Sequence, residues 1–265
     1  MKKETNSTAT IYILVLFAIV LFTANSCKKS PQTGTPSQTQ QQSADNSKGQ
    51  TSKADTNIPK VVSGDVNRLV PIDIKLPKPM FVGTPQNIQV SNLEKPLDKP
   101  RQPFLAPAGT KNVAFEKLVV SSYKEPIIGE IEMITDGDKE AADGSYVELG
   151  PFLQNVTIDL GAEYDIYAIL LWHYHKEARV YFDVVVQVAD DPDFITNVRT
   201  LFNNDGDNSS GLGAGSDMHY VETAEGKLID AKGVRARYVR LYSNGNSSNE
   251  LNHYIEVEVF GKPAI

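Results

Sequence analysis

The fold is decided by residues 156–191, which read VTIDLGAEYDIYAILLWHYHKEARVYFDVVVQVADD. This stretch holds three apolar runs separated by short polar breaks, and each run is rich in Val, Ile, Leu and Tyr, which suit a pleated, half-buried surface. In the third run, apolar residues recur at every second position from Phe182 to Val188, which is the period of a strand with one buried face. The middle run at 166–172 is apolar on both faces, which predicts a central strand covered on each side. We therefore expect two stacked sheets.

Turn and strand signals continue at short intervals after Gly109, as is typical of an all-β sandwich with almost no helix. The expected strands are 118–121, 127–134, 156–160, 166–173, 181–189, 199–202, 219–221, 237–242 and 254–260. In the last strand, Val257 and Val259 alternate with Glu256 and Glu258, which predicts one buried and one polar face. A domain of about 150 residues is large enough for a single core without disulfides.

The first 27 residues have the layout of a secretory signal. An apolar run at 11–22 follows two lysines, and small residues lead to Cys27, which is the single cysteine of the chain. This end resembles the lipobox of bacterial lipoproteins, in which the cysteine is acylated, although Ala24 stands where that motif usually has Leu. An uncleaved membrane anchor is the alternative, but the run is shorter than the ~20 residues that a spanning helix needs. Either arrangement predicts an exported protein that is tethered to the membrane in the cell envelope.

The residues between the signal and the domain fall into two segments. Residues 28–60 are Ser, Thr, Gln, Asn and Lys with almost nothing large and apolar, so we expect a disordered stalk. Residues 61–110 contain prolines at 71, 77, 79, 85, 96, 100, 103 and 107, which block helix and central strand and predict an extended chain. This Pro-rich segment either wanders free or lies across the domain. The second arrangement would use apolar contacts from Leu76, Met80, Phe81 and Phe104.

The charge of the chain bears on its partners. The net charge is −7 and the isoelectric point is near 5.2, without the clustered basic face that nucleic acid or anionic lipid requires. We therefore expect no nucleic-acid partner.

Five motifs beyond position 109 resemble, in order and rough spacing, the discoidin or coagulation factor F5/8 type C domain and the related family 32 carbohydrate-binding modules. The motifs are NVAFEK at 112–117, ITDGD at 134–138, TIDLG at 157–161, ARYVRLYS at 236–243 and IEVEVFG at 255–261. The resemblance implies a jelly-roll β-sandwich, galactose-binding-domain-like, at residues 111–262. Two features depart from the family: Asn155 stands where a Trp is usual, and the terminal cysteine pair of the animal domains is missing. This scaffold hosts binders of sugars, lipid headgroups and proteins, so the fold alone does not settle the function.

The turn at 134–138 offers two carboxylates and exposed carbonyls, which are hard oxygen ligands that suit calcium. The resemblance implies a structural calcium ion here, held by backbone carbonyls, by Asp136 or Asp138, and by Glu256 of the last strand. The alternative is an ordinary Asp-Gly turn with a solvated acidic pair.

A second acidic loop at 203–217 begins like an EF-hand loop, with Asp205, Asp207 and Ser209 at alternate positions. It then departs from that pattern, because Ser210 and Ser216 stand where a Gly and a bidentate Glu are needed. A flexible surface loop is the favoured interpretation.

Residues 172–179, WHYHKEAR, allow two kinds of site. His173 and His175 are two apart on a predicted strand, as in cupin metal sites, which Glu177 and His219 or His253 could complete. Alternatively, this strand end forms one wall of a sugar site, in which histidine and arginine side chains bond to hydroxyls. Trp172 itself is expected to pack in the core.

The third candidate loop, at 243–253, is rich in Asn and ends in His253, and amides of this kind pair with sugar hydroxyls. Exposed tyrosines would supply the apolar platform for a pyranose face. We place the site among the loops at 142–148, 173–180 and 244–253. The predicted ligand-binding residues are Tyr146, Tyr174, His175, Arg179, Asn246, Asn252 and His253.

No motif for nucleophilic, zinc-protease or phosphate-transfer chemistry is present, and Glu256 and Glu258 share one face of one strand instead of flanking a bond. The sequence therefore predicts a non-catalytic, surface-tethered lipoprotein that binds glycan through a calcium-stabilised sandwich. The alternatives are an adhesion or structural lipoprotein that binds another envelope protein and, less favoured, a cupin-like metalloenzyme.

Overall fold

The computed structural model describes residues 68–81, 87–97 and 99–264, which belong to the compact unit Lys60–Ile265. The predicted signal segment with Cys27, the predicted stalk at 28–60 and residues 61–67 lie outside the described residues. Within the described ranges, no helix has the length and apolar character that crossing a membrane requires.

The regular secondary structure of the described residues is antiparallel β-sheet apart from one short 3-10 helix, η1 (Ile131–Thr135), so the all-β prediction is confirmed. The strands are β1 (Leu69–Pro71), β2 (Leu105–Pro107), β3 (Lys111–Asn112), β4 (Leu118–Ser121), β5 (Val147–Leu149), β6 (Gln154–Trp172), β7 (Val185–Ala189), β8 (Arg199–Asn203), β9 (Lys227–Ser243), β10 (Asn252–Tyr254) and β11 (Glu256–Pro263).

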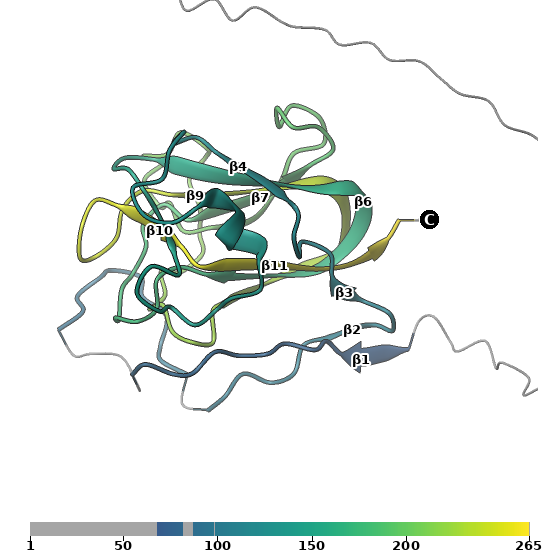
Figure 1. Ribbon diagram of the computed structural model, residues 1–265, viewed down its shortest axis with the longest axis horizontal. Coiled ribbons are helices and arrows are strands. Elements are labelled where there is room, and N and C mark those ends of the chain that lie inside the picture. The colour runs from purple at the N-terminus through teal and green to yellow at the C-terminus, as the bar shows by residue number, and fades with distance from the viewer. Residues whose placement is uncertain (1–67, 82–86, 98, 265) are drawn as a thin grey trace, which may run out of the picture. The chain divides into compact units, whose positions relative to one another are not determined.

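Two long strands, β6 and β9, build both layers of the sandwich. Their pairing is interrupted between Asp159 and Tyr164, around Gly161, whose φ of +83° suits a glycine. Before the interruption β6 pairs with β4, and after it with β11, while β9 stays its partner on the other edge. Figure 1 shows β6 curving from the layer that holds β4 and β7 to the layer that holds β11. One layer is therefore β4-β6-β9-β7-β8 and the other is β3-β11-β6-β9.

The main core fills the space between these layers. Both inner faces contribute β-branched and leucine side chains, each worth roughly 1.5–3 kcal/mol when fully buried. Val184, Val186 and Val188 lie in this core as their alternation predicts, whereas Phe182 is only half-buried, since β7 begins later than expected, at Val185. Core residues from the other strands include Val156, Ile158, Ile169, Leu171, Ile229, Val239, Leu241, Val257 and Val259.

The outer face of β6 is also covered, as its two apolar faces predict, and the Pro-rich segment supplies part of that cover. Leu170 and Trp172 are fully buried in a second apolar cluster that includes Ile72 and Ala106, with Phe104 packed against it. The predicted contacts between this segment and the domain are confirmed only in part. Phe104 packs on the cluster, whereas Leu76 and Met80 are exposed.

Hydrogen bonds and ion pairs hold the Pro-rich segment in place. Its β1 and β2 pair as a hairpin, which the Ile72 amide extends by donating to the Phe104 carbonyl at 3.0 Å. Arg101 donates to the carbonyls of Glu225 and Gly226 at 2.6 and 3.1 Å, just before β9. The described parts of this segment therefore form part of the folded domain.

The structure corrects several expected strands. Residues 127–134 hold only an isolated bridge from Ile128 to Glu148 and then η1. The cause is Gly129, at φ +76°, where an added Cβ would meet the Tyr146 carbonyl oxygen at 2.2 Å, so the chain turns there. Residues 219–221 make only one isolated bridge, from His219 to Leu93, and the expected strands at 156–160 and 166–173 are one strand, β6.

Candidate functional site

A cluster of rings forms where the loops meet at the end of the sandwich that carries β10, opposite the bend of β6 (Figure 1). The ring centroids of Tyr146 and Tyr174 lie 4.9 Å apart, tilted by 60°, and each lies 5.9 Å from the His253 ring. The guanidinium carbon of Arg179 stands over the Tyr174 ring, 4.7 Å from its centroid. Four predicted binding residues from three separate loops are thus neighbours, and we call them the ring site.

Short strands fix the ring site. β5 and β10 pair antiparallel with His253 opposite Glu148, and Tyr146 immediately precedes β5. Tyr174 follows the last residue of β6 by two positions. Tyr146, Tyr174, Glu148 and Arg179 are all half-buried, so each keeps part of its side chain in solvent.

His253 is the most constrained side chain of the ring site. Its Nδ1 lies 3.0 Å from the Tyr181 hydroxyl, and its Nε2 lies 3.0 Å from the Glu148 carboxylate. Burial, reinforced by the positive charge of Arg179 and by His173, lowers the pKa of His253 to about 3, so the ring is neutral. Burial also raises the pKa of Tyr181 well above its usual value. The hydroxyl therefore donates to Nδ1, and Nε2 donates to Glu148, which fixes the ring orientation.

Arg179 is held by two contacts. Its Nη2 donates to the Glu177 carboxylate at 2.8 Å, and its planar group lies against Tyr174, an arrangement worth about 0.5–2 kcal/mol. Its Nη1 is buried and has no hydrogen-bond partner among the described residues. The guanidinium is thus oriented before any ligand arrives.

The other three predicted binding residues shape the loops from within. The His175 ring is buried, and its Nε2 donates to the Lys139 carbonyl at 2.9 Å. Asn252 is fully buried, and its amide nitrogen donates to the carbonyls of Gly150 and Phe152 at 2.8 and 2.9 Å. Asn246 closes its own turn, since its side-chain nitrogen donates to the Leu251 carbonyl at 2.9 Å. The structure brings these three near the ring site but does not turn them toward solvent.

The histidines do not assemble a cupin-like metal site. His173 is buried and stacks on Tyr181 at 4.2 Å, with its Nδ1 3.0 Å from the Glu222 carboxylate, whereas His175 is bonded to a backbone carbonyl. His219 lies elsewhere, edge-on to Phe182 at 5.7 Å. Among the residues that the structure describes, no group of three ligand atoms suitable for a metal includes a histidine.

The carboxylates of Asp183, Asp205 and Asp207 do come together, with oxygens within 4.8 Å of one another. Asp205 is buried, and its oxygens accept hydrogen bonds from the backbone and hydroxyl of Ser210 and from the Ser209 amide. Although burial opposes ionisation, the Ser210 hydrogen bonds keep the pKa of Asp205 below its usual value. The loop's own donors thus stabilise the ionised carboxylate of Asp205.

The turn predicted to hold calcium lies directly over Glu256 of β11. The Gly137 amide donates to one Glu256 carboxylate oxygen at 3.1 Å. Asp136 accepts a 2.8 Å hydrogen bond from the amide of Asp138, and both aspartates are exposed. Glu256 lies on what the sequence pattern predicted as the polar face of its strand, but the turn covers it and its side chain is fully buried.

The second Glu256 oxygen, Oε1, is buried and has no partner among the described residues. Burial raises the pKa of Glu256 to about 9, because the Gly137 hydrogen bond alone does not offset the lost hydration. An oxygen of this kind, beside exposed carboxylates and turn carbonyls, fits a hard divalent cation such as calcium.

No protein-family model matches this sequence, and no curated protein matches it. Several solved structures are similar. The family 32 carbohydrate-binding module of AlyQ, in complex with 4,5-unsaturated mannuronic acid, is 18% identical over 55% of this chain and 96% of its own, with a TM-score of 0.41. Chitosan-binding module 1 of a Paenibacillus sp. IK-5 chitosanase/glucanase is 20% identical over 57% of this chain and 98% of its own, with a TM-score of 0.41. CpGH89CBM32-4 of Clostridium perfringens, in complex with GlcNAc-α-1,4-galactose, is 19% identical over 58% and 96%, with a TM-score of 0.43.

Sequence reasoning missed three residues that organise the ring site: Glu148, Tyr181 and the buried Glu222. Glu148 lies between Val147 and Leu149 in a strand of three residues, too short for alternation to be recognised. Tyr181 was expected in a strand, but its hydrogen bond to His253 joins residues 72 positions apart. Only the three-dimensional arrangement reveals such pairs.

Proposed function

We propose that this domain is a non-catalytic carbohydrate-binding module whose sugar ligand lies in the ring site. The supporting observation is the convergence of the half-buried Tyr146 and Tyr174 with Arg179 and with the Glu148–His253 pair. The loops that carry these residues are far apart in sequence, and the sandwich brings them to one rim.

The chemistry of the ring site suits a pyranose. Aromatic faces of Tyr146 and Tyr174 provide apolar contact for the C–H groups of a sugar ring, and their phenol groups can donate and accept. Arg179 offers donors in a fixed plane, and Glu148 offers carboxylate oxygens. Since each of these groups is already oriented by a neighbour, binding costs little ordering entropy.

The pairing of the polar groups in the ring site suits binding of a sugar without its hydrolysis. Glu148 accepts a hydrogen bond from His253, and Arg179 is paired with Glu177, so these groups hold positions that suit binding. Burial raises the pKa of Glu148. Glycoside hydrolysis needs two carboxyl groups that face each other across the scissile bond, whereas here Glu148 is bonded to His253 and Glu177 is bonded to Arg179.

We further propose that calcium binds at the 134–138 turn, with Glu256, Asp136 or Asp138, and turn carbonyls as its ligands. When bound, the ion would neutralise the buried Glu256 carboxylate. This turn begins the loop that runs through Lys139, which accepts the His175 hydrogen bond, to Tyr146. A rigid turn would therefore help to hold the ring site open.

The domain would act at a surface. We propose that the exported chain is acylated at Cys27 and held in the cell envelope, with residues 28–60 as the spacer that lets the module reach a polymer. A glycan is then the partner, and the lipid anchor supplies the contact with the membrane.

Binding to immobilised and soluble glycans tests this proposal. Affinity electrophoresis and calorimetry on galactose-, glucose-, glucosamine- and uronate-containing polymers should show retention for at least one sugar, with a Kd in the millimolar to micromolar range. The Tyr174→Ala variant should lose that binding, whereas Ile195→Ala should not, because Ile195 is 80% exposed on a loop outside the ring site. Equal binding by both variants, or no retention on any polymer, would refute the proposal.

A further inference from the structure

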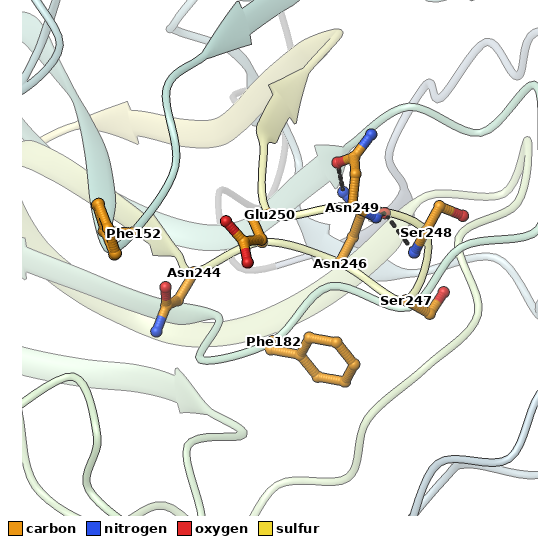
Figure 2. Close-up of a pocket in the computed structure, with 9 residues that line it drawn as sticks. Phe152, Phe182, Asn244, Asn246, Ser247, Ser248, Asn249 and Glu250 are labelled. Atoms are coloured by element: carbon orange, nitrogen blue, oxygen red, sulfur yellow. Dashed lines mark hydrogen bonds between the residues drawn. The ribbon is translucent and has the colours of Figure 1, made fainter.

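A second hollow, open to solvent, lies on the same rim as the ring site and has a volume of about 490 Å³. Figure 2 shows Phe152 on one side of it, the 244–250 loop along the other, and Phe182 beneath that loop. We call this hollow the Phe152 pocket. Its lining is Phe152, Phe182, Asn244, Gly245, Asn246, Ser247, Ser248, Asn249 and Glu250.

The floor of the Phe152 pocket is a tight turn held by its own hydrogen bonds. Gly245 has a φ of +72°, and an added Cβ would lie 3.1 Å from the Glu250 Cα, so the turn closes this tightly only around glycine. Asn246 fastens the turn from inside, accepting from the Ser248 amide at 2.9 Å and donating to Asn249 at 2.8 Å. A pocket with a fixed shape loses little conformational entropy when it binds a ligand.

Phe152 is an exposed aromatic residue held in a costly backbone conformation. Its side chain is 76% exposed and its φ is +68°, a left-handed value that costs an L-residue roughly 1–2 kcal/mol. The fully buried Asn252 secures this conformation by donating to the Phe152 carbonyl at 2.9 Å. Such strain persists where the surroundings impose it, and it is concentrated at functional sites. Here it presents a flat apolar face at the mouth of a polar pocket.

One charged group opposite that face is available to a ligand. Among the described residues, the Glu250 carboxylate makes no hydrogen bond or ion pair, and Figure 2 shows it projecting toward the side on which Phe152 and Asn244 lie. One aromatic platform facing amides, hydroxyls and a carboxylate is the composition that a sugar ring with its hydroxyl groups requires.

The Phe152 pocket adjoins the ring site. Ser247, which lines the pocket, donates its amide to the Val180 carbonyl at 2.8 Å, and Val180 directly follows Arg179. On the other side, Asn252 holds Phe152 while its neighbour His253 belongs to the ring site. The backbones of the two sites are thus about 5 Å apart, the spacing of neighbouring strands, so one glycan chain can reach both sites.

Charge distinguishes the two sites. The Phe152 pocket carries Glu250, and its Asn244 is hydrogen bonded to Asp183 of the acidic group at 2.8 Å. No arginine or lysine lines the pocket. A sugar that carries its own carboxylate would be repelled there, whereas a neutral or amino sugar would not.

We propose that the Phe152 pocket is a second subsite that binds the next sugar unit of the same glycan, and that this unit is a neutral or amino sugar and never a uronate. This inference rests on the proposed function of the ring site and assigns its ligand as an oligosaccharide of at least two units.

Calorimetry with matched monosaccharides and tetrasaccharides of galactose, N-acetylglucosamine, glucosamine and galacturonate tests the proposal. For a sugar that binds, the tetrasaccharide should bind at least tenfold more tightly than the monosaccharide. Phe152→Ala and Glu250→Gln should remove most of that difference and leave monosaccharide affinity within twofold, while Tyr174→Ala should weaken both ligands. Tetragalacturonate should gain nothing over its monosaccharide.

The outcomes separate the two ideas. Absence of binding to any sugar refutes the ring site itself. Two results would refute only the second subsite. In the first, monosaccharide binding depends on Tyr174, but the tighter binding of the tetrasaccharide survives in both pocket variants. In the second, tetragalacturonate gains as much affinity over its monosaccharide as a neutral tetrasaccharide does. Ile195→Ala serves as the exposed control, and the conservative Glu250→Gln keeps the test valid if Phe152→Ala proves poorly folded.

Discussion

Truncating Ile72 should destabilise the whole domain, although Ile72 lies in the Pro-rich segment that precedes it. The Ile72 side chain is only 8% exposed and packs in the cluster that buries Leu170 and Trp172 of β6. Removal of a buried isoleucine side chain to alanine costs 2–5 kcal/mol, and we expect about 2–3 kcal/mol here because the site lies near the surface.

The loss is measurable from the single tryptophan of the chain, which reports on this cluster. For a domain of this size, 1 kcal/mol shifts the melting temperature by about 2–4 °C, so Ile72→Ala should melt roughly 5–10 °C lower. Leu76→Ala is the matched control, because Leu76 lies in the same segment but is 47% exposed, and its change should stay within about 0.5 kcal/mol.

Urea unfolding followed by Trp172 fluorescence and by far-ultraviolet circular dichroism gives the free energy of unfolding of each variant. Coincident transitions, shifted only in Ile72→Ala, would support a segment that is part of the fold. Equal midpoints for the two variants would refute the packing argument, and so would a chain beginning at Gly109 that is as stable as the full protein.

Calcium at a hundred times its Kd should stabilise the protein by about 2.7 kcal/mol and raise its melting temperature by roughly 5–10 °C, an effect that EDTA reverses and that Glu256→Gln lacks. His253 has a folded pKa of about 3 against about 6.5 when unfolded, so it favours folding above pH 6.5 and this contribution falls as pH drops toward 3. Glu256, with its raised pKa, contributes in the opposite direction in both proteins, so the His253 contribution is the difference between them. From pH 7 to pH 5 the wild type should lose about 2 kcal/mol of unfolding free energy relative to His253→Gln, as measured by denaturation at each pH. Gly226→Ala would place a Cβ 2.7 Å from the Trp172 ring at a φ of +62°, so it should lower the melting temperature by several degrees, whereas Gly206→Ala, with nothing within 4 Å, should not.

The strand pattern of the core was readable from the sequence because alternation and β-branched runs directly encode burial. Both apolar faces of the run at 166–172 correctly indicated cover on each side, but no pattern says whether a second sheet or an extended proline-rich chain provides that cover. The run at 127–134 is apolar enough for a strand, but Gly129 adopts a positive φ of +76° and the 3-10 helix η1 follows it.

The sequence indicated which loops form the candidate site, but not which of their side chains face solvent. Tyr146, Tyr174, Arg179 and His253 converge, as hydrogen-bonding and aromatic types on rim loops suggest. Whether a polar residue faces solvent or braces a turn depends on contacts between distant segments, such as the bond from Asn252 to Gly150, and composition does not encode these.

The bent strands β6 and β9 belong to both layers, so the two layers should unfold together. Each of these two strands runs through both layers, although their pairing is interrupted between Asp159 and Tyr164, so the layers are joined by two unbroken strands. Amide protons in both layers should then exchange at one common, slow rate, and a cut or inserted loop should be tolerated at the 244–250 rim far better than at the 160–163 bend.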